Sequence, residues 1–389
     1  MILRQEIWAF LLALPFIARS NRDEVQDEIP PAYPFPCDVR GYRSREIPSS
    51  VHYLRPGDID VVGAIGDSLT AGTTAFGENL YDLFTMDNRG LSFSMGGQKT
   101  WRQYLTLPNI LKEFNPQLVG FSLGDGKSEN RNAQFNVAVA GAMDQDLLYE
   151  AKVLVRRISK DPRVDMQRHW KLINVWIGTN DMCSDECFDR SQTPETHRKN
   201  LELAIDYLYA HLPRTFVNLI SAPYIPAYAK LTNLEDACQT LRKISCPCLF
   251  GPNEAEKFKY VDKLSRGYQK AEQDLIASGR YSKREDFTVE FQPTFLNFEF
   301  PYKIGSNGRK FTDYSFLAID CFHFSQKLHA RAANLLWNNL LEEPGKKSTH
   351  LKPIFHRFNC PTPNSPFLQT FNNSVLNTKK SSFTNQWQR

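Results

Sequence analysis

The stretch Ile59-Asp60-Val61-Val62-Gly63-Ala64-Ile65 runs directly into Gly66-Asp67-Ser68-Leu69. The first part is an apolar run of the length expected for a buried strand. Ser68 therefore lies where a strand ends and a turn begins. Because sites in open α/β sheets form at that edge, we expect Ser68 to belong to a functional site.

A second string, Asp320-Cys321-Phe322-His323, lies far along the chain and supplies a base and an acid. A serine hydroxyl is a weak nucleophile that needs a neighbouring base, and His323 is the candidate. Asp320 can hold the imidazole in the useful tautomer and stabilise the imidazolium that forms. The structural alternative is that Asp320 caps a helix beginning near Phe324, with His323 packed among aromatic rings.

Two further segments predict donors for a developing oxyanion. The apolar strand Leu172-Ile173-Asn174-Val175-Trp176-Ile177 leads into Gly178-Thr179-Asn180-Asp181, so the Asn180 amide can point to the same edge. Upstream, Asn136-Val137-Ala138-Val139-Ala140-Gly141 places a glycine in a polar turn. The backbone N–H of Gly141 can approach a substrate closely because no side chain shields it.

This order of serine, glycine, asparagine and Asp-x-x-His, each at the end of a predicted strand, resembles the GDSL (SGNH) hydrolases. The resemblance implies that Ser68 is the nucleophile and that Asp320 and His323 complete a catalytic triad. It also implies an oxyanion hole made of the Ser68 and Gly141 N–H groups and the Asn180 side chain.

Within that superfamily the chain is most similar to the phospholipase B family, the animal membrane-associated phospholipases. The similarity extends from about Tyr53 to Leu368 and is carried by three strings: Gly90-Leu91-Ser92-Phe93-Ser94-Met95-Gly96-Gly97, Leu107-Pro108-Asn109-Ile110-Leu111-Lys112-Glu113-Phe114-Asn115-Pro116 and Asp320-Cys321-Phe322-His323-Phe324-Ser325. It implies a serine esterase with phospholipase A and lysophospholipase activity, acting on phospholipid or lysophospholipid through an acyl-enzyme. The alternatives are a carboxylesterase or deacetylase for small or glycan-linked esters, and a catalytically silent lipid-binding protein.

Strand and helix candidates alternate along the chain, which predicts a three-layer α/β/α fold around a central, mostly parallel sheet of five strands. The expected helices are Leu147–Ser159, Asn200–His211 and about Ser325–Leu341, the last with an apolar face of Leu328, Ala332, Leu335, Leu336 and Leu340. The expected strands are Ile59–Ile65, Leu118–Leu123, Leu172–Ile177, Thr215–Ser221 and Phe287–Gln292.

Composition agrees with one large enzyme domain. The 389 residues are 41% hydrophobic, which is enough for a sizeable core, and no internal repeat is visible. The net charge of +4, from 47 basic and 43 acidic residues, is too small and dispersed to predict nucleic-acid binding and leaves only transient contact with a membrane surface. No cofactor is implied, because serine chemistry supplies its own nucleophile and base, and no twelve-residue calcium loop is present.

The N-terminal residues predict export. An apolar stretch from Ile7 to Ala18 follows Arg4, and Ala18-Arg19-Ser20 has the small residues of a cleavage site, so residues 1–20 are interpreted as a signal peptide. An uncleaved membrane anchor is the alternative. We expect a loosely attached N-terminal arm at 21–52, the hydrolase domain at 53–345 and an irregular C-terminal extension at 346–389. The protein is therefore predicted to be secreted or lumenal, without a transmembrane helix.

Eight cysteines in a chain with an export signal predict disulfides. We expect Cys183 to pair with Cys187 and Cys321 to pair with a distant cysteine such as Cys360. Cys246 and Cys248 are too close in sequence to pair easily, so at least one should reach Cys238 or a distant partner. A zinc site is the competing interpretation. The sequon Asn372-Asn373-Ser374 is a possible glycan site.

Other polar residues are given structural roles. Asp67 is expected to fix the turn beside Ser68 by accepting backbone N–H groups. His169, His197 and His211 have no acid partner at useful sequence spacing, so we interpret them as surface or packing residues. His329 lies six positions after His323 and is expected to point elsewhere.

Overall fold

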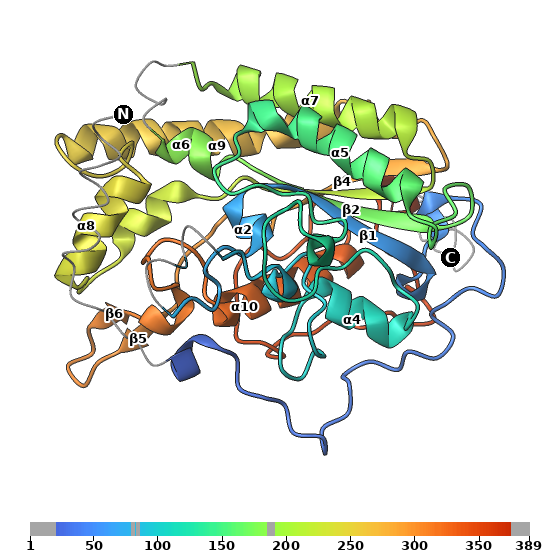
Figure 1. Ribbon diagram of the computed structural model, residues 1–389, viewed down its shortest axis with the longest axis horizontal. Coiled ribbons are helices and arrows are strands. Elements are labelled where there is room, and N and C mark those ends of the chain that lie inside the picture. The colour runs from blue at the N-terminus through green and yellow to red at the C-terminus, as the bar shows by residue number, and fades with distance from the viewer. Residues whose placement is uncertain (1–20, 79–81, 83–85, 185–190, 375–389) are drawn as a thin grey trace, which may run out of the picture.

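The computed structural model describes residues 21–78, 82, 86–184 and 191–374. Within these residues, the main sheet has four parallel strands in the order β1-β2-β3-β4. They are β1 (Ile59–Gly66), β2 (Trp170–Trp176), β3 (Thr215–Ile220) and β4 (Phe287–Gln292). Because all strands run the same way, their carboxyl ends meet at one edge of the sheet, as Figure 1 shows.

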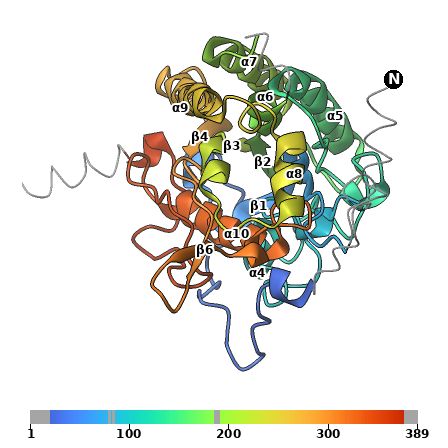
Figure 2. The same ribbon diagram turned by 90° about the vertical axis from the view of Figure 1, so that its left-hand side faces the viewer.

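Helices cover both faces of this sheet, so the predicted three-layer α/β/α fold is confirmed (Figures 1 and 2). One face carries α5 (Leu147–Lys160), α7 (Pro194–His211) and α9 (Glu254–Ala277), and the other carries α4 (Leu107–Phe114) and α10 (Gln326–Leu341). The alternation of side chains along β1 decides which layer each residue enters. Val61 and Ile65 pack in the cluster with α5, whereas Val62 and Ala64 pack in the cluster with α10.

The smaller elements lie around the carboxyl edge of the sheet and beyond it. They are the helices α2 (Ser68–Ala71), α6 (Thr179–Cys183) and α8 (Asp236–Ser245), the 3-10 helices η6 (Asp144–Asp146) and η8 (Ile225–Lys230), and the hairpin of β5 (Tyr302–Ile304) and β6 (Lys310–Thr312). Figure 1 shows the hairpin and α8 at the same end of the molecule, on the left.

The prediction of a fifth strand at Leu118–Leu123 is wrong. This segment meets β1 through a single parallel bridge between Val61 and Val119, and the Val62 N–H donates to the Val119 carbonyl at 2.9 Å. The next residue, Gly120, has a φ of +99°, and a Cβ there would lie 2.2 Å from the Val62 carbonyl oxygen. The left-handed backbone at Gly120 therefore ends the ladder after one bridge.

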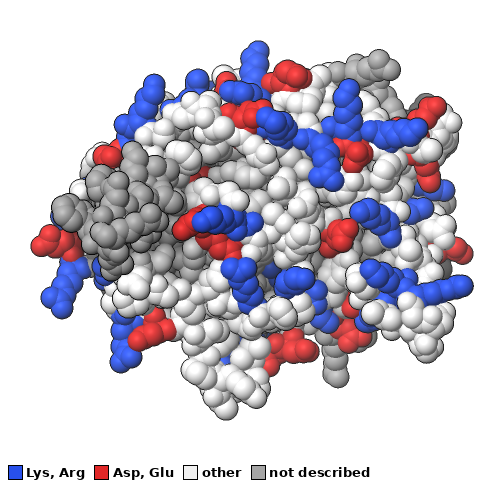
Figure 3. Space-filling view, turned by 180° about the vertical axis from the view of Figure 1, so that it is seen from behind, with Lys and Arg blue, Asp and Glu red and all other residues white. Residues whose placement is uncertain are grey.

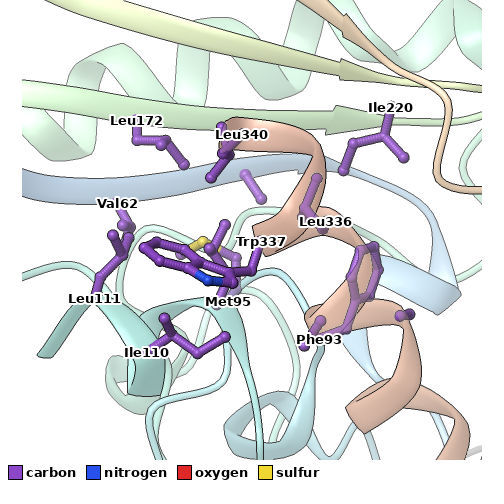
Figure 4. Packing of buried hydrophobic residues seen from close by; sticks show 14 of the residues in the cluster. Val62, Phe93, Met95, Ile110, Leu111, Leu172, Ile220, Leu336, Trp337 and Leu340 are labelled. Atoms are coloured by element: carbon purple, nitrogen blue, oxygen red, sulfur yellow. The ribbon is translucent and has the colours of Figure 1, made fainter. Parts of the chain in front are cut away.

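The face of α10 predicted from the sequence is confirmed. Its five apolar residues are all buried, and Figure 4 shows Leu340 beside Leu172 of the sheet and the Trp337 ring extending toward Val62. The Trp337 ring also stacks on Phe114 of α4, with centroids 5.4 Å apart. Burying each leucine of this face contributes roughly 1.5–3 kcal/mol, so the helix that follows His323 is held firmly on the sheet.

The N-terminal arm is bound more firmly than its composition predicted. The Gln26 backbone N–H donates to Gln326 Oε1 at 2.8 Å, and Gln26 Oε1 accepts from the Leu105 N–H at 2.7 Å. Cys37 forms a disulfide with Cys360, which fastens the arm to the C-terminal extension. The loose attachment that we expected for this segment is therefore corrected, while its domain boundary at residue 53 stays a prediction.

Disulfides are present, and Cys321 pairs with a distant cysteine as expected, but the expected partners of Cys183 and Cys321 are wrong. Cys183 bonds to Cys246 and Cys238 bonds to Cys321, so neither a Cys183–Cys187 loop nor a Cys321–Cys360 bridge forms. The expectation that Cys246 reaches a distant partner is confirmed, and Cys248 is also disulfide-bonded. Cys187 lies outside the described residues. The fold overrides sequence proximity here, because the end of α8 packs against α6.

Charged side chains of both signs cover the face shown in Figure 3, with acidic residues lying between the basic ones. In the part of the chain that the structure describes, no helix combines the length and the apolar character that crossing a membrane requires. The same residues contain no group of three His, Cys, Asp or Glu side chains placed to hold a metal ion. Residues 1–20, predicted to be a signal peptide, lie outside the described residues.

Candidate active site

Ser68 occupies a tight turn between β1 and α2. Gly66 ends the strand, and a Cβ there would lie 2.3 Å from the Trp176 carbonyl oxygen, so only glycine fits. The Asp67 side chain accepts from the Leu69 N–H at 3.0 Å and caps α2, which confirms its expected role in the turn. Ser68 is the first residue of the helix, so its own N–H has no acceptor within that helix.

Ser68 meets the predicted base and acid. His323 Nε2 lies 2.8 Å from Ser68 Oγ, and His323 Nδ1 forms a hydrogen bond with Asp320 Oδ2. Asp320 Oδ1 accepts from the Phe322 N–H at 3.0 Å and the His323 N–H at 2.9 Å, so the carboxylate also shapes its own turn. All three side chains are buried, with Ser68 3% and His323 8% exposed. The structure thus brings Ser68 into one hydrogen-bonded row with the Asp320 and His323 pair, which lies more than 250 residues further along the chain.

The alternative role for Asp320 as a helix cap does not hold. Helix α10 begins at Gln326, and its N-cap is Ser325, whose side chain accepts from the Leu328 N–H at 3.4 Å. Asp320 lies before that turn and directs one carboxylate oxygen at the imidazole. Its geometry is that of an orienting acid rather than of a helix cap.

The electrostatics of the pair favour a charged aspartate beside a basic histidine. Burial raises the pKa of Asp320, but the His323 charge and the N–H donors outweigh it, so the net pKa is lowered. Burial lowers the pKa of His323, yet the carboxylates of Asp320, Asp67 and Asp87 raise it above 6.5 overall. Burial also raises the pKa of Asp67 to about 6, against the opposing hydrogen bond from Leu69. A raised histidine pKa makes the imidazole a stronger base for the serine proton.

The loop that bears Asp320 and His323 is held in place by contacts with elements outside the main sheet. Cys321 has a φ of +59° and is bonded to Cys238 of α8. The Tyr228 hydroxyl donates to the Phe322 carbonyl oxygen at 2.8 Å, and the two rings stack with centroids 4.9 Å apart. A covalent bond, a hydrogen bond and a ring contact therefore hold residues 321 and 322 between the two triad members.

The two predicted oxyanion donors lie in segments that touch: Asn180 in the first turn of α6, and Gly141 in the loop before η6. Asn180 Nδ2 donates to the Ala142 carbonyl oxygen at 2.8 Å, and Ala142 directly follows Gly141. Gly141 is exposed with a φ of +85°, and a Cβ there would meet nothing within 4 Å. Glycine is thus required by backbone conformation rather than by space. Among the described residues, its N–H has no protein acceptor, which leaves it open to a ligand.

Glu150 connects this turn to the nucleophile, and the sequence interpretation missed it. Glu150 Oε2 accepts from the Gly66 N–H at 2.7 Å, and Oε1 accepts from the Val139 N–H at 3.2 Å. Burial raises the pKa of Glu150 well above its ordinary value. A signal was present, because Glu150 lies three residues after Leu147 and four before Leu154 and so falls on the apolar face of α5.

The histidine interpretations are correct except at one position. His169 is half-buried and His211 is exposed, while His329 is buried in the core with Nδ1 3.3 Å from the Phe93 backbone nitrogen. His197 does have acid partners, Asp144 and Glu272, at 3.0 and 3.3 Å. They come from other elements, so spacing along the sequence could not reveal them.

A separate cavity of about 680 Å³ lies beyond β4, between that strand and residues 344–349. Its walls include apolar Ile276 and Val289 together with Glu290 and Lys347. None of the five predicted site residues lines this cavity, so it is distinct from the Ser68 site.

A parallel α/β sheet with a Ser-His-Asp row at its carboxyl edge defines a serine ester hydrolase of the GDSL type. The chain belongs to the GDSL-like Lipase/Acylhydrolase family, whose pattern matches residues 62–336.

The chain is similar to curated proteins named as phospholipase B1. The chain is 44% identical over 345 residues to "Phospholipase B1, membrane-associated" of Rattus norvegicus, and 42% identical over 348 residues to the protein of the same name in Homo sapiens. These alignments cover 86% and 85% of this chain but only 23% of either relative, so the chain spans less than a quarter of their length. The resemblance to the phospholipase B family is thereby confirmed.

Among solved structures, a psychrotrophic esterase of Pseudoalteromonas sp. is 12% identical to the chain, with a TM-score of 0.33. That similarity covers 70% of this chain and 93% of the esterase.

Proposed function

We propose that this protein is a secreted or lumenal serine esterase that hydrolyses the acyl esters of phospholipids and lysophospholipids. The observation that carries the proposal is the row in which His323 Nε2 lies 2.8 Å from Ser68 Oγ while Nδ1 is bonded to Asp320. That row has the contacts which serine activation requires.

The proposed reaction has two halves. In the first, Ser68 Oγ attacks the ester carbonyl carbon while its proton passes to His323 Nε2. The tetrahedral intermediate collapses, the C–O bond to the glycerol oxygen breaks, and His323 returns the proton to that leaving alcohol. In the second half, a water molecule gives a proton to His323 and attacks the acyl-enzyme. The fatty acid leaves as Ser68 recovers its proton.

Charge on the intermediate would fall on the former carbonyl oxygen. The proposed donors to it are the N–H groups of Ser68 and Gly141 and the Asn180 amide. The contact from Asn180 to Ala142 uses one of the two hydrogens on Nδ2, and the other remains for the substrate. Donors fixed before the reaction stabilise developing charge without reorganising, and each is worth about 2.7–4 kcal/mol.

The lipid substrate class is inferred from the relatives. The printed name of the proteins that share 44% and 42% identity with this chain is phospholipase B1. Identity over 86% of the chain includes the segments that carry all five site residues, which supports the same class of ester here. The chain has less than a quarter of those relatives' length, so its acyl position and chain-length preference are matters for experiment.

The compartment is part of the same proposal. Disulfides persist in oxidising surroundings, and bonds such as Cys238–Cys321 support an extracellular or lumenal location. Cleavage of a signal peptide after residue 20 and a glycan on Asn372 complete the proposal and are each checked by mass spectrometry of the secreted protein.

Product analysis tests the substrate class. The purified chain is incubated with diacyl phospholipid, lysophospholipid, triacylglycerol and a short-chain aryl ester, beside a Ser68→Ala control. We expect fatty acid release from both phospholipids by the wild type and none above background from the variant. Hydrolysis of the aryl ester alone would replace the lipid proposal with a small-ester carboxylesterase. Equal release by Ser68→Ala would remove Ser68 as the nucleophile.

A further inference from the structure

A buried ionisable cluster lies behind the proposed oxyanion hole. His197 of α7 is 0% exposed and lies between Asp144 of η6 and Glu272 of α9. Its Nδ1 is 3.0 Å from Asp144 Oδ2, and its Nε2 is 3.3 Å from Glu272 Oε1. The imidazole therefore connects two helical elements from within the core.

The two contacts of this histidine favour its doubly protonated form. A carboxylate oxygen accepts hydrogen bonds and a neutral imidazole carries only one N–H. A neutral His197 would direct a lone pair at one of its two carboxylates, whereas an imidazolium donates to both. Burial lowers the pKa of His197, but the bonds to Asp144 and Glu272 raise it to about 9 overall.

Two other side chains, Tyr268 and Asp181, belong to the cluster around His197. The Tyr268 ring of α9 stacks on the imidazole, with centroids 3.9 Å apart. Asp181 of α6 adjoins Asp144, and burial together with that neighbouring carboxylate raises its pKa well above the ordinary value. Asp144 and Glu272 are the two carboxyl groups in direct contact with the imidazole. Burial raises the pKa of Glu272, and its hydrogen bond with His197 acts in the opposite direction.

The cluster reaches both predicted oxyanion donors through the backbone. The Asp144 N–H donates to Asp181 Oδ1 at 3.1 Å, and Asp181 directly follows Asn180. Asp144 itself lies two residues after Ala142, the residue whose carbonyl accepts from Asn180. The bond between the Asp144 N–H and the Asp181 side chain therefore joins the segment that follows Gly141 to the segment that bears Asn180.

We propose that His197, protonated on both nitrogens, is a positioning residue for the oxyanion hole: by donating to Asp144 and Glu272 it keeps the Gly141 turn in place beside Asn180. The inference rests on the function proposed above, because it needs an oxyanion hole to act on. His197 touches no substrate in this account and acts only through Asp144.

Turnover separates this role from simple packing. We compare His197→Gln with His329→Gln, because both histidines are 0% exposed, but among the described residues the His329 ring contacts the Phe93 N–H and aromatic rings rather than carboxylates. Burial lowers the pKa of His329 to about 3, so that ring is neutral. His197→Gln should lower kcat on an aryl ester by up to about 10²-fold with little change in KM, since misplaced catalytic groups cost that much. His329→Gln should alter Tm rather than kcat. Wild-type kcat in folded His197→Gln would overturn the proposal.

A pH profile provides a readout that packing alone would not change. The kcat of the wild type should fall as the pH rises through about 9, because His197 then loses a proton and one carboxylate loses its donor. In Glu272→Gln the side-chain amide can donate a hydrogen bond to the neutral Nε2 of His197. The decline in kcat at alkaline pH should therefore disappear in this variant. Each profile is normalised to its value near neutral pH before the two are compared. An identical decline in both proteins would contradict the proposal, and this comparison decides the matter even if His197→Gln fails to fold.

Nitrogen-15 histidine spectra of Ser68→Ala separate this inference from the proposed function. Both ring nitrogens of His197 should carry protons at neutral pH, whether or not any ester is hydrolysed. A neutral tautomer would overturn the inference alone. Absence of hydrolysis by the wild type on every ester, with His197 doubly protonated, would instead overturn the proposed function.

Discussion

The side-chain amide of Asn180 donates to the backbone carbonyl oxygen of Ala142 at an N···O distance of 2.8 Å. This bond joins the start of α6, which follows β2, to the loop that contains Gly141 and Ala142. Two predicted oxyanion donors from segments far apart in sequence are thereby held at a fixed spacing. The amide has a second hydrogen, which is the one available to a substrate oxygen.

Replacing Asn180 with alanine should lower kcat by roughly 10²–10³-fold and leave KM nearly unchanged, because the amide donates mainly to charge that develops in the transition state. Steady-state kinetics on an aryl ester measure both constants. Asn297→Ala, at an exposed asparagine, serves as the control. A rise in KM alone would make Asn180 a ground-state binding residue.

The acidic side of the pH profile of kcat/KM should report the ionisation of His323. The base must be neutral to accept the serine proton, and Asp320 raises its pKa, so kcat/KM should reach half its maximum above pH 6.5. Asp320→Asn removes the main raising charge, which should move this side of the profile to lower pH. The same change favours the wrong tautomer and should reduce the plateau by about 10⁴-fold. An unshifted profile with full activity would leave Asp320 a structural residue.

Much of this arrangement could be predicted from the sequence, because local signals pointed to it. The apolar run at Ile59–Ile65 predicted β1 to within one residue, and the spacing of leucines predicted α10 together with its buried face. Ser68 follows the end of β1 as expected. Asp320 and His323 were also expected at a strand end, but they lie in the loop between the 3-10 helix Tyr314–Phe316 and α10, so the Asp-x-x-His motif alone pointed to them. The sequence wrongly predicts a strand at Gly120, because a pattern of apolar residues does not reveal a left-handed backbone conformation.

Glu150→Gln tests the connection between the nucleophile turn and the Gly141 turn. The carboxylate accepts from both Gly66 and Val139, whereas an amide can accept from only one and turns an NH₂ group toward the other. An unpaired buried donor costs about 1–3 kcal/mol, so Tm should fall and kcat should decline with it. Glu113→Gln on α4, a half-buried glutamate whose pKa is also raised by burial, is the matched control. Equal behaviour of the two variants would show that Glu150 has no special role.

The Cys238–Cys321 bond should matter to turnover as well as to stability. It links residues 83 apart, and the chain-entropy model assigns such a bond roughly 4–5 kcal/mol. Its removal by paired serine substitutions should free the loop between Asp320 and His323 and lower kcat at temperatures where circular dichroism is still native. The control replaces Cys37 and Cys360, whose bond joins residues 323 apart in sequence and lies away from the triad. This variant should have a lower Tm and an unchanged kcat. The opposite ranking of the two variants in kcat would contradict this account.

Contacts between distant elements set the limit of sequence interpretation. The partners of Cys183 and Cys321 depend on where α8 packs, and no spacing rule contains that information. His197 was judged by its sequence neighbours, yet its two carboxylates come from η6 and α9. Buried polar clusters of this kind are specified by tertiary packing, so a single sequence shows their members without showing their pairing.

The central claim is that Ser68 is the nucleophile of a Ser-His-Asp esterase. The most direct measurement is covalent labelling with an organophosphonate, followed by peptide mapping of the wild type and of His323→Ala. The account predicts one phosphonylated residue, Ser68, in the wild type and strongly slowed labelling in the variant, because His323 takes up the serine proton. Labelling at another serine, or labelling of Ser68 at the same rate without His323, would contradict it.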